Sequence, residues 1–248
     1  MIDAKSRSFA ELVGFDPAKM GAAAEETHGT TVLAVRFDKG VLILADRRAT
    51  MGNLIMYDQA EKIEVIDDTM VIAISGSYAR SIEVCRFLKH SLKYYERMNL
   101  YEVSAEGKLM EVSRALAGNM QMAMQGIGVF LPIAAVYDNR KKTFLVSFFD
   151  AAGARFQSGD FAAAGSGSER IRGSFNYIER TKGPWNERKL DDVGSEALLL
   201  LEIAADLDSA TGGSTKVLPS ARILTKDGVE NVDDKTITRW NKASARSA

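Results

Sequence analysis

Residues 28–46 read HGTTVLAVRFDKGVLILAD, and this stretch decides the fold class. It contains two apolar runs, Thr31–Phe37 and Val41–Asp46, separated by the short turn Asp38–Gly40. Two such runs joined through D-K-G indicate a β-hairpin. Residues 1–29 are rich in alanine and acidic side chains and show no such periodicity. The folded domain is therefore expected to begin directly after that segment.

The rest of the chain alternates between strand-like and helix-like patterns. A second hairpin is expected where Lys62–Ile66 and Met70–Ser75 flank Asp67-Asp68. Later strands are expected at Ile127–Tyr137, Thr143–Phe149, Arg155–Ser158 and Thr215–Leu224, with a short piece after Asp227-Gly228. Helices are expected at residues 82–95, 109–120, 169–180 and 191–207.

This order of elements predicts one α+β domain. Strands that pair in hairpins form antiparallel sheets, and two such sheets packed face to face would bury the apolar strands. The helix pairs would then cover the two outer faces. The last residues, 242–248 (KASARSA), are expected to fray, as chain ends commonly do.

Composition excludes several classes of protein. The chain has 248 residues with 32 Lys+Arg and 33 Asp+Glu, which is not the balance of a nucleic-acid binder. Its longest apolar runs, Gly128–Tyr137 and Ala197–Ala205, are about half as long as a membrane span. The first residues lack the apolar core of a secretory signal. Because Cys85 is the only cysteine, an internal disulfide is excluded, and a cytoplasmic protein is expected.

Histidine and cysteine counts also limit the chemistry. The two histidines are His28 and His90, and the chain has no HExxH, CxxC or GxxxxGK[ST] motif. A metal site, a P-loop and a bound cofactor are therefore not expected. His90 lies in a charged helical pattern and is expected at the surface. Three methionines are expected to fill gaps in the core, at positions 120, 122 and 124.

The pair Gly29-Thr30 could carry chemistry at the start of the first strand. If the bond between them were cut, Thr30 would carry both a hydroxyl and a free α-amine. Such an amine has a pKa of about 7.7–8.0, so at neutral pH it can take a proton from the hydroxyl. Nucleophile and base would then belong to one residue. The alternative is that Gly-Thr-Thr simply begins a strand, which is common in β structure.

Several motifs together resemble the catalytic β subunit of the 20S proteasome, in its bacterial form. They are TTVLAVRFDKGVLILADRRATMGNLI, EKIEVI, ISGSYA, MQGIGVFLPIAAVYD, AAAGSGSER and DLDSATGGST, and they extend from Thr30 to about Leu224. The resemblance implies an N-terminal nucleophile hydrolase with a four-layer αββα sandwich over residues 30–248. It also implies that residues 1–29 are a propeptide removed by self-cleavage at the bond between Gly29 and Thr30.

The resemblance implies a role for each matched residue. Thr30 matches the nucleophile, Lys62 the lysine that favours ionisation of its hydroxyl, and Asp46 the acid that pairs with this lysine. Without the resemblance, Asp46 and Lys62 could be an ordinary surface ion pair. Gly76 matches the residue whose N–H faces the oxyanion, a contact worth about 3–4 kcal/mol.

Three further residues match positions near the terminal amine: Ser166, Asp208 and Thr211. Thr211 stands where many family members have serine, and the hydroxyl is kept. The chain departs from the family at Gly213-Ser214-Thr215, where relatives often continue GGPD, so the local loop shape is in doubt. GSGS could also be a phosphate loop, but no Lys-Ser or Lys-Thr follows it.

The resemblance also implies a specificity pocket and partners. Ala49, Ala60 and Ile74 would line the pocket for the residue before the scissile bond, so cleavage after hydrophobic residues is expected. The chain would join other β subunits in heptameric rings, with α subunits, in a 28-subunit α7β7β7α7 particle. An ATP-driven ring unfoldase would supply unfolded protein substrates.

Two alternatives remain open. The chain could be a non-catalytic structural ring subunit, although every matched catalytic position holds a usable residue. It could also be a simpler bacterial threonine protease built only of β-like rings. The DRRAT and DSATGG segments and the long propeptide favour the proteasome type.

Overall fold

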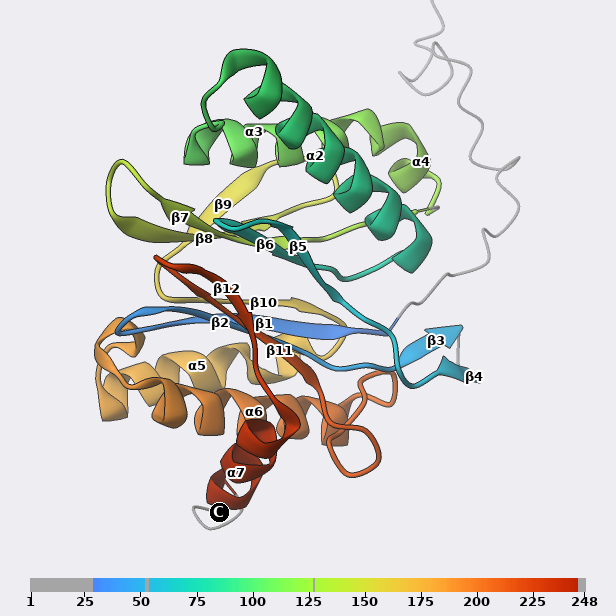
Figure 1. Ribbon diagram of the computed structural model, residues 1–248. Coiled ribbons are helices and arrows are strands. Elements are labelled where there is room, and N and C mark those ends of the chain that lie inside the picture. The colour runs from blue at the N-terminus through green and yellow to red at the C-terminus, as the bar shows by residue number, and fades with distance from the viewer. Residues whose placement is uncertain (1–28, 52–53, 127, 245–248) are drawn as a thin grey trace, which may run out of the picture.

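The computed structural model describes residues 29–51, 54–126 and 128–244. Within them, two five-stranded antiparallel sheets are stacked face to face (Figure 1). The first sheet has the order β10-β1-β2-β11-β12, formed by Phe161–Gly165, Thr31–Phe37, Gly40–Ala45, Ser220–Thr225 and Gly228–Asn231. The second has the order β5-β6-β7-β8-β9, formed by Ile63–Asp67, Met70–Ala73, Ile133–Asp138, Thr143–Phe149 and Arg155–Ser158.

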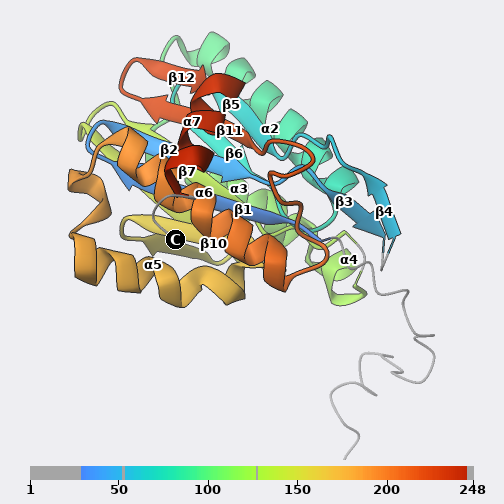
Figure 2. The same cartoon turned by 90° about the horizontal axis from the view of Figure 1, so that it is seen from below.

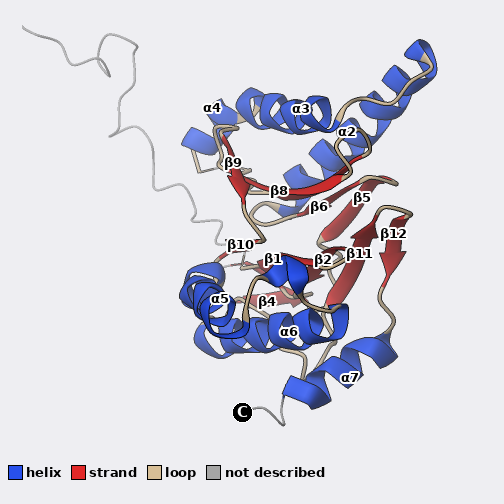
Figure 3. Ribbon diagram, turned by 90° about the vertical axis from the view of Figure 1, so that its left-hand side faces the viewer, coloured by secondary structure: helices blue, strands red, loops and turns tan. Residues whose placement is uncertain are grey.

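Helices cover both outer faces of this pair of sheets. The second sheet is covered by α2 (Tyr78–Asn99) and α3 (Ala105–Gly118), as Figure 3 shows. The first sheet is covered by α5 (Ser168–Lys182) and α6 (Leu190–Leu207), which lie side by side in Figure 2. The predicted four-layer α+β sandwich is confirmed.

Alternation along the strands explains why the first hairpin reads as two unbroken apolar runs. Successive side chains of a strand point to opposite faces. In β1, Leu33 and Val35 pack in the cluster under α5 and α6, whereas Val32 and Ala34 pack between the two sheets. Both faces of this central strand are buried, so both sets of positions are apolar.

Six elements of the described residues were not predicted from the sequence. They are β3 (Ala49–Met51), β4 (Leu54–Tyr57), β10, α4 (Met120–Met124), the 3-10 helix η2 (Trp185–Glu187) and α7 (Asp234–Ser244). The strand expected at 127–137 was wrong over residues 128–132, because β7 begins only at Ile133, and residue 127 lies outside the described part. The strand expected at Thr215–Leu224 was also wrong in its first part, because β11 begins at Ser220. The three methionines at 120, 122 and 124 do not fill the core, since 44%, 47% and 66% of their surfaces are exposed.

Helix α7 packs against α6 through two buried side chains, Ile237 and Trp240. The Trp240 side chain is 1% exposed, and its Nε1–H donates to Asp191 Oδ1 at 2.8 Å. A Cβ atom on Gly194 would lie 2.4 Å from the indole ring, so glycine leaves the space that this ring occupies. The helix runs through Ser244, so any frayed tail starts after it, and residues 245–248 lie outside the described part.

None of the helices in the described residues combines the length and apolar character that crossing a bilayer requires. His90 is exposed on α2, as predicted, and Cys85 on the same helix is buried.

Candidate active site

The start of β1 is held from both sides. Thr31 pairs with Gly165 of β10, and Val32 pairs with Ala45 of β2. Gly165 has φ +98°, and a Cβ atom there would lie 1.8 Å from the carbonyl oxygen of Thr30. Only glycine therefore lets β10 approach β1 at this point.

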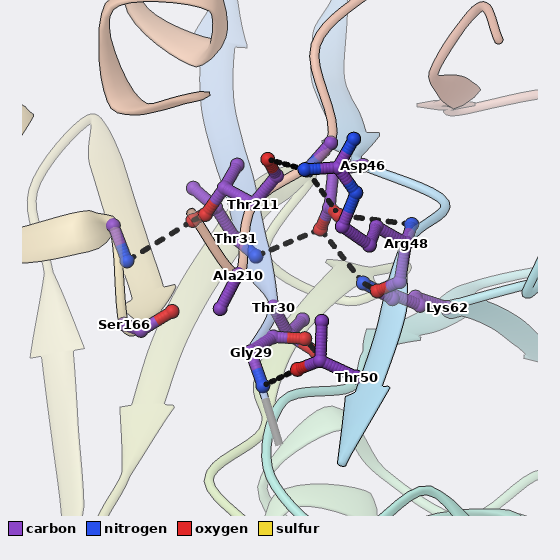
Figure 4. A network of polar contacts seen from close by, with 12 residues as sticks. Gly29, Thr30, Thr31, Asp46, Arg48, Thr50, Lys62, Ser166, Ala210 and Thr211 are labelled. Carbon is purple, nitrogen blue, oxygen red and sulfur yellow. Dashed lines mark hydrogen bonds and ion pairs between the residues drawn. The ribbon is translucent and has the colours of Figure 1, made fainter. Parts of the chain in front are cut away.

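Thr30 is buried next to a peptide bond that it could attack (Figure 4). Its side chain hydroxyl donates a hydrogen bond to the carbonyl oxygen of Gly29 at 2.6 Å. The N–H of Gly29 donates to Thr50 Oγ1 at 3.0 Å, so both the N–H and the carbonyl oxygen of Gly29 are held by hydrogen bonds. A Cβ atom on Gly29 would lie 1.9 Å from the Cβ of Ala210. Any side chain at position 29 would therefore move the Gly29–Thr30 peptide bond away from the Thr30 hydroxyl.

A buried ion pair lies one residue away. Asp46 follows β2 and Lys62 precedes β5, and Lys62 Nζ lies 2.8 Å from Asp46 Oδ1. The Lys62 side chain is 2% exposed and the Asp46 side chain is 0% exposed. The same Oδ1 accepts the backbone N–H of Thr31 at 2.8 Å. Burial lowers the pKa of Lys62, and the nearby Asp46 carboxylate opposes this effect. The ammonium is thus anchored to the residue that follows Thr30.

Arg48 connects this ion pair to the loop after α6. Its backbone N–H donates to Asp46 Oδ2 at 3.0 Å, and its carbonyl oxygen accepts a hydrogen bond from Lys62 Nζ. Its guanidinium donates to the carbonyl oxygens of Ser209 and Thr211 at 3.0 and 3.1 Å. Arg48 therefore aligns two segments of the site that are far apart in the sequence.

Gly76 lies at the end of β6 in a conformation that favours glycine. Its φ is +93°, and a Cβ atom would lie 2.2 Å from the carbonyl oxygen of Val129. Gly76 is paired with Phe130, and hydrogen bonds to this neighbouring segment come from the residues on either side of Gly76. In such an antiparallel pair the N–H of Gly76 itself points away from Phe130. Its direction suits a donor to a group outside the sheet.

Asp208 gathers two hydroxyls after the end of α6. Its Oδ2 accepts hydrogen bonds from Ser166 Oγ and from Thr211 Oγ1, the latter at 2.6 Å. Burial raises the pKa of Asp208, but these two hydrogen bonds outweigh it and hold the pKa below its usual value. The three residues that were grouped from the sequence are therefore in mutual contact.

The proteasome subunit family matches residues 26–217, a span that contains all of the residues described above. The chain belongs to the proteasome subunit family. Named relatives of this proteasome subunit are β subunits. A proteasome subunit beta from Acidothermus cellulolyticus is 34% identical over 224 residues, which cover 88% of this chain and 75% of the relative. A proteasome subunit beta from Acidimicrobium ferrooxidans is 32% identical over 238 residues, covering 91% and 84% respectively.

Of the three residues expected to line a pocket in this proteasome subunit, Ile74 belongs to the apolar cluster under α2 and α3. Ala49 is half-buried on β3, whereas Ala60 and Ile74 are 3% and 2% exposed. The N–H of Ala60 donates to the carbonyl oxygen of Arg47, and that of Ile74 donates to the carbonyl oxygen of Lys62. The backbone therefore places both residues beside the ion pair, while their role in specificity stays a prediction.

Four residues that shape the site were not identified from the sequence: Thr31, Arg48, Thr50 and Gly165. The available signals were the repeated threonine after Gly29 and the paired arginines after Asp46. Neither signal says what the side chain contacts. Among the described residues of this proteasome subunit, no three His, Cys, Asp or Glu side chains are grouped so that they could hold a metal ion.

Proposed function

We propose that this proteasome β subunit is the precursor of a threonine endopeptidase, with Thr30 as its nucleophile. The observation that carries the proposal is the hydrogen bond from the Thr30 hydroxyl to the carbonyl oxygen of Gly29, beside the buried Asp46–Lys62 pair. A hydroxyl so close to the carbonyl group of the preceding peptide bond can attack that bond within its own chain.

Self-cleavage would activate the chain. Thr30 Oγ1 forms a bond to the carbonyl carbon of Gly29 and gives up its proton, and the carbon–nitrogen bond to Thr30 breaks. The proton passes to the leaving nitrogen, which becomes the α-amine. Water then hydrolyses the ester that joins Gly29 to Thr30 Oγ1. Residues 1–29 leave with a new carboxylate, and the domain that remains starts at Thr30. Residues 1–28 lie outside the described part of the chain.

Hydrolysis of other peptides would use the same hydroxyl. The free α-amine takes the proton from Thr30 Oγ1 as the oxygen attacks the scissile carbonyl carbon. Lys62 stabilises the developing alkoxide by its charge, Asp46 holds Lys62, and the N–H of Gly76 donates to the oxyanion. The amine then protonates the leaving nitrogen, and water hydrolyses the acyl ester. The cluster of Ser166, Asp208 and Thr211 would bind and orient the α-amine. This chemistry needs no metal and no cofactor.

Assembly into rings agrees with the exposed surface. The small β3–β4 hairpin stands out from the side of the sandwich (Figure 1). It exposes five large apolar side chains: Met51, Leu54, Ile55, Met56 and Tyr57. An isolated two-stranded hairpin is at best marginally stable in water, so a partner is expected to cover it. We propose heptameric β rings capped by α rings in the cytoplasm, to which an ATP-driven unfoldase delivers unfolded proteins.

Removal of the Thr30 hydroxyl tests the function. After assembly with its α partner, the wild-type chain is expected to start at Thr30, as intact mass and N-terminal sequencing would show. Thr30→Ala is expected to keep residues 1–29 and to have no peptidase activity above background, because both reactions need the hydroxyl. Thr30→Ser keeps a hydroxyl and is expected to process and cleave more slowly.

Three other outcomes would contradict the proposed function. A wild-type chain that still started at Met1 in assembled particles would support a structural ring subunit. Full activity of Thr30→Ala would point to a contaminating protease. Active rings that formed from this chain alone, with no binding to an α-type subunit, would support the simpler β-ring protease.

A second prediction concerns specificity. Small side chains at Ala49 and Ala60 and an apolar one at Ile74 leave room for a large apolar residue before the scissile bond. A panel of fluorogenic peptides is expected to be cleaved fastest after leucine, phenylalanine or tyrosine. Ala49→Phe is expected to reduce these rates roughly 10–200-fold, the range typical of lost apolar pocket contacts, and to affect peptides with alanine there much less. Faster cleavage after arginine or aspartate would contradict this assignment.

A further inference from the structure

Thr31 is bonded to both halves of the site. It is fully buried, with no exposed surface. Its N–H donates to Asp46 Oδ1 at 2.8 Å, on the side of the lysine. Its hydroxyl oxygen lies 2.7 Å from Thr211 Oγ1 and accepts the N–H of Gly167 at 3.2 Å, on the side of Asp208. Figure 4 shows Thr31 between these two groups.

The positions of the hydroxyl protons follow from counting donors. Each threonine hydroxyl has one proton and two lone pairs. The proton of Thr211 is donated to Asp208 Oδ2. Thr211 must therefore accept in its contact with Thr31, and the proton of Thr31 points to Thr211. The result is an aligned chain of donors that runs from the N–H of Gly167 through Thr31 and Thr211 to the carboxylate of Asp208.

Alignment of this kind fixes the Thr211 oxygen. With its proton held by Asp208 and one lone pair occupied by Thr31, Thr211 has a single lone pair left to accept another donor. Neighbouring hydrogen bonds in such a chain also polarise one another. Gly167 lies directly against both hydroxyls, because a Cβ atom there would lie 2.4 Å from Thr31 Oγ1 and 2.9 Å from Thr211 Oγ1.

We propose that the Thr31 hydroxyl is a positioning group, which fixes the Thr211 hydroxyl so that its free lone pair accepts a hydrogen bond from the α-amine of Thr30. This inference rests on the function proposed above, in which that amine is the base. Thr31 itself does not react, and it acts only through Thr211 and through the start of β1.

The charged groups around the amine come from four parts of the fold. They are Asp46 after β2, Arg48 and Lys62 between β2 and β5, Asp208 after α6, and Arg170 on α5. A substitution at Thr31 changes none of these charges. A hydroxyl-free residue removes the donor to Thr211 and the acceptor of the Gly167 N–H, both of them uncharged contacts, so a change in the pH profile would report on the proposed contact with the amine.

The sign of that change follows from the proposal. A fixed acceptor stabilises the protonated amine and so raises the pKa of the amine. Without the Thr31 hydroxyl, the Thr211 oxygen is free to turn, and the protonated amine loses this stabilisation. The acidic limb of the pH profile of kcat/KM should then move to lower pH, while the misplaced amine accepts the proton less efficiently.

The test compares Thr31→Val with Thr31→Ser in particles assembled with the α partner. Thr31→Val keeps the shape of the threonine side chain but has no hydroxyl, whereas Thr31→Ser keeps the hydroxyl. For Thr31→Val we expect kcat to fall roughly tenfold with little change in KM, and the acidic limb to move by about one to two pH units, as expected for loss of one hydrogen bond to a charged group. Thr31→Ser should stay within about twofold of wild type. Thr181→Val, on the exposed face of α5, is the matched control and should behave as wild type.

Each outcome decides the inference. A Thr31→Val particle with wild-type kcat, or with a lower kcat and an unmoved acidic limb, would overturn it. Thr31→Ala serves as a second hydroxyl-free variant. If neither hydroxyl-free variant assembled while Thr31→Ser did, the hydroxyl would have a purely structural role. A wild-type particle no more active than Thr30→Ala would refute the proposed function, and this inference with it.

Discussion

Replacement of Lys62 by methionine is expected to abolish self-cleavage and to reduce peptidase activity roughly a thousandfold, in the middle of the range for loss of a group that assists proton transfer. The ammonium is anchored by Asp46, whose Oδ1 also accepts the N–H of Thr31, the residue that follows Thr30. Methionine fills similar space but carries no charge to stabilise the alkoxide. Its substitution also leaves the Asp46 carboxylate buried without a counter-ion, which costs about 3–5 kcal/mol. The readouts are the fraction of chains that start at Thr30 and kcat/KM of the assembled particle.

Lys108 offers a matched control for this experiment. It is also a buried lysine, with a side chain 5% exposed, and its Nζ lies 2.6 Å from Asp67 Oδ2 and 2.7 Å from Thr69 Oγ1. It lies on α3, on the outer side of the second sheet. Lys108→Met should also reduce stability, although by less than Lys62→Met, because the Asp67 side chain is 34% exposed and stays partly hydrated. It should leave self-cleavage intact. If both variants lost self-cleavage equally, instability would explain the result and the role of Lys62 would have to be abandoned.

Gly165→Ala is expected to prevent the start of β1 from forming. The added Cβ would lie 1.8 Å from the carbonyl oxygen of Thr30, and the residue has φ +98°, which alanine rarely adopts. Backbone strain and overpacking each cost about 1–3 kcal/mol, so the free energy of unfolding should fall by roughly 3 kcal/mol or more. The measurement is urea unfolding of the precursor in a Thr30→Ala background, where no self-cleavage occurs. With Thr30 present, Gly165→Ala should not process.

The same substitution at Gly173 provides the control. Gly173 lies on α5, and a Cβ atom there would meet nothing within 4 Å. Gly173→Ala should stabilise the helix by about 0.5–1 kcal/mol, because alanine loses less backbone freedom on folding than glycine. A Gly165→Ala chain that was as stable as Gly173→Ala, and that processed normally, would show that β10 does not constrain Thr30.

Elements with strong periodicity could be predicted from the sequence. The predicted bounds of β1, β8 and β9 agree with the structure, and α5 and α6 differ by only one or two residues at their ends. Elements without such a signal were missed. The strand β10 reads FAAAG, and its small residues favour no particular element, so its pairing with β1 is decided by the tertiary structure. The helix α7 is mostly polar, and among its described side chains only Ile237 and Trp240 belong to the buried core cluster, with the Trp240 ring in the space above Gly194.

The site shows the same division. Thr30, Asp46 and Lys62 could be named because short motifs surround each of them in the sequence. The contacts of Thr31 could not, because its hydroxyl partners, Gly167 and Thr211, are distant in the chain and approach it only after β10 has paired with β1. Arg48 was missed for a similar reason, since its guanidinium binds carbonyl oxygens of a loop that follows α6. Residue types suggested the proposed chemistry, whereas the packing determines which groups surround the proposed nucleophile.

The position of β1 between β10 and β2 has a consequence for the chain end that self-cleavage would create. Chain ends usually fluctuate, because few contacts hold their first residues. Here the new end would be the residue directly before a central strand, with ladder partners on both sides and a carboxylate bound to the next N–H. The precursor would lose the conformational entropy of this terminus when it folds. The activation free energy of each catalytic turnover would therefore not include that loss. An enzyme that depends on its own first residue would thereby have a nucleophile as rigid as one in the interior of a sheet.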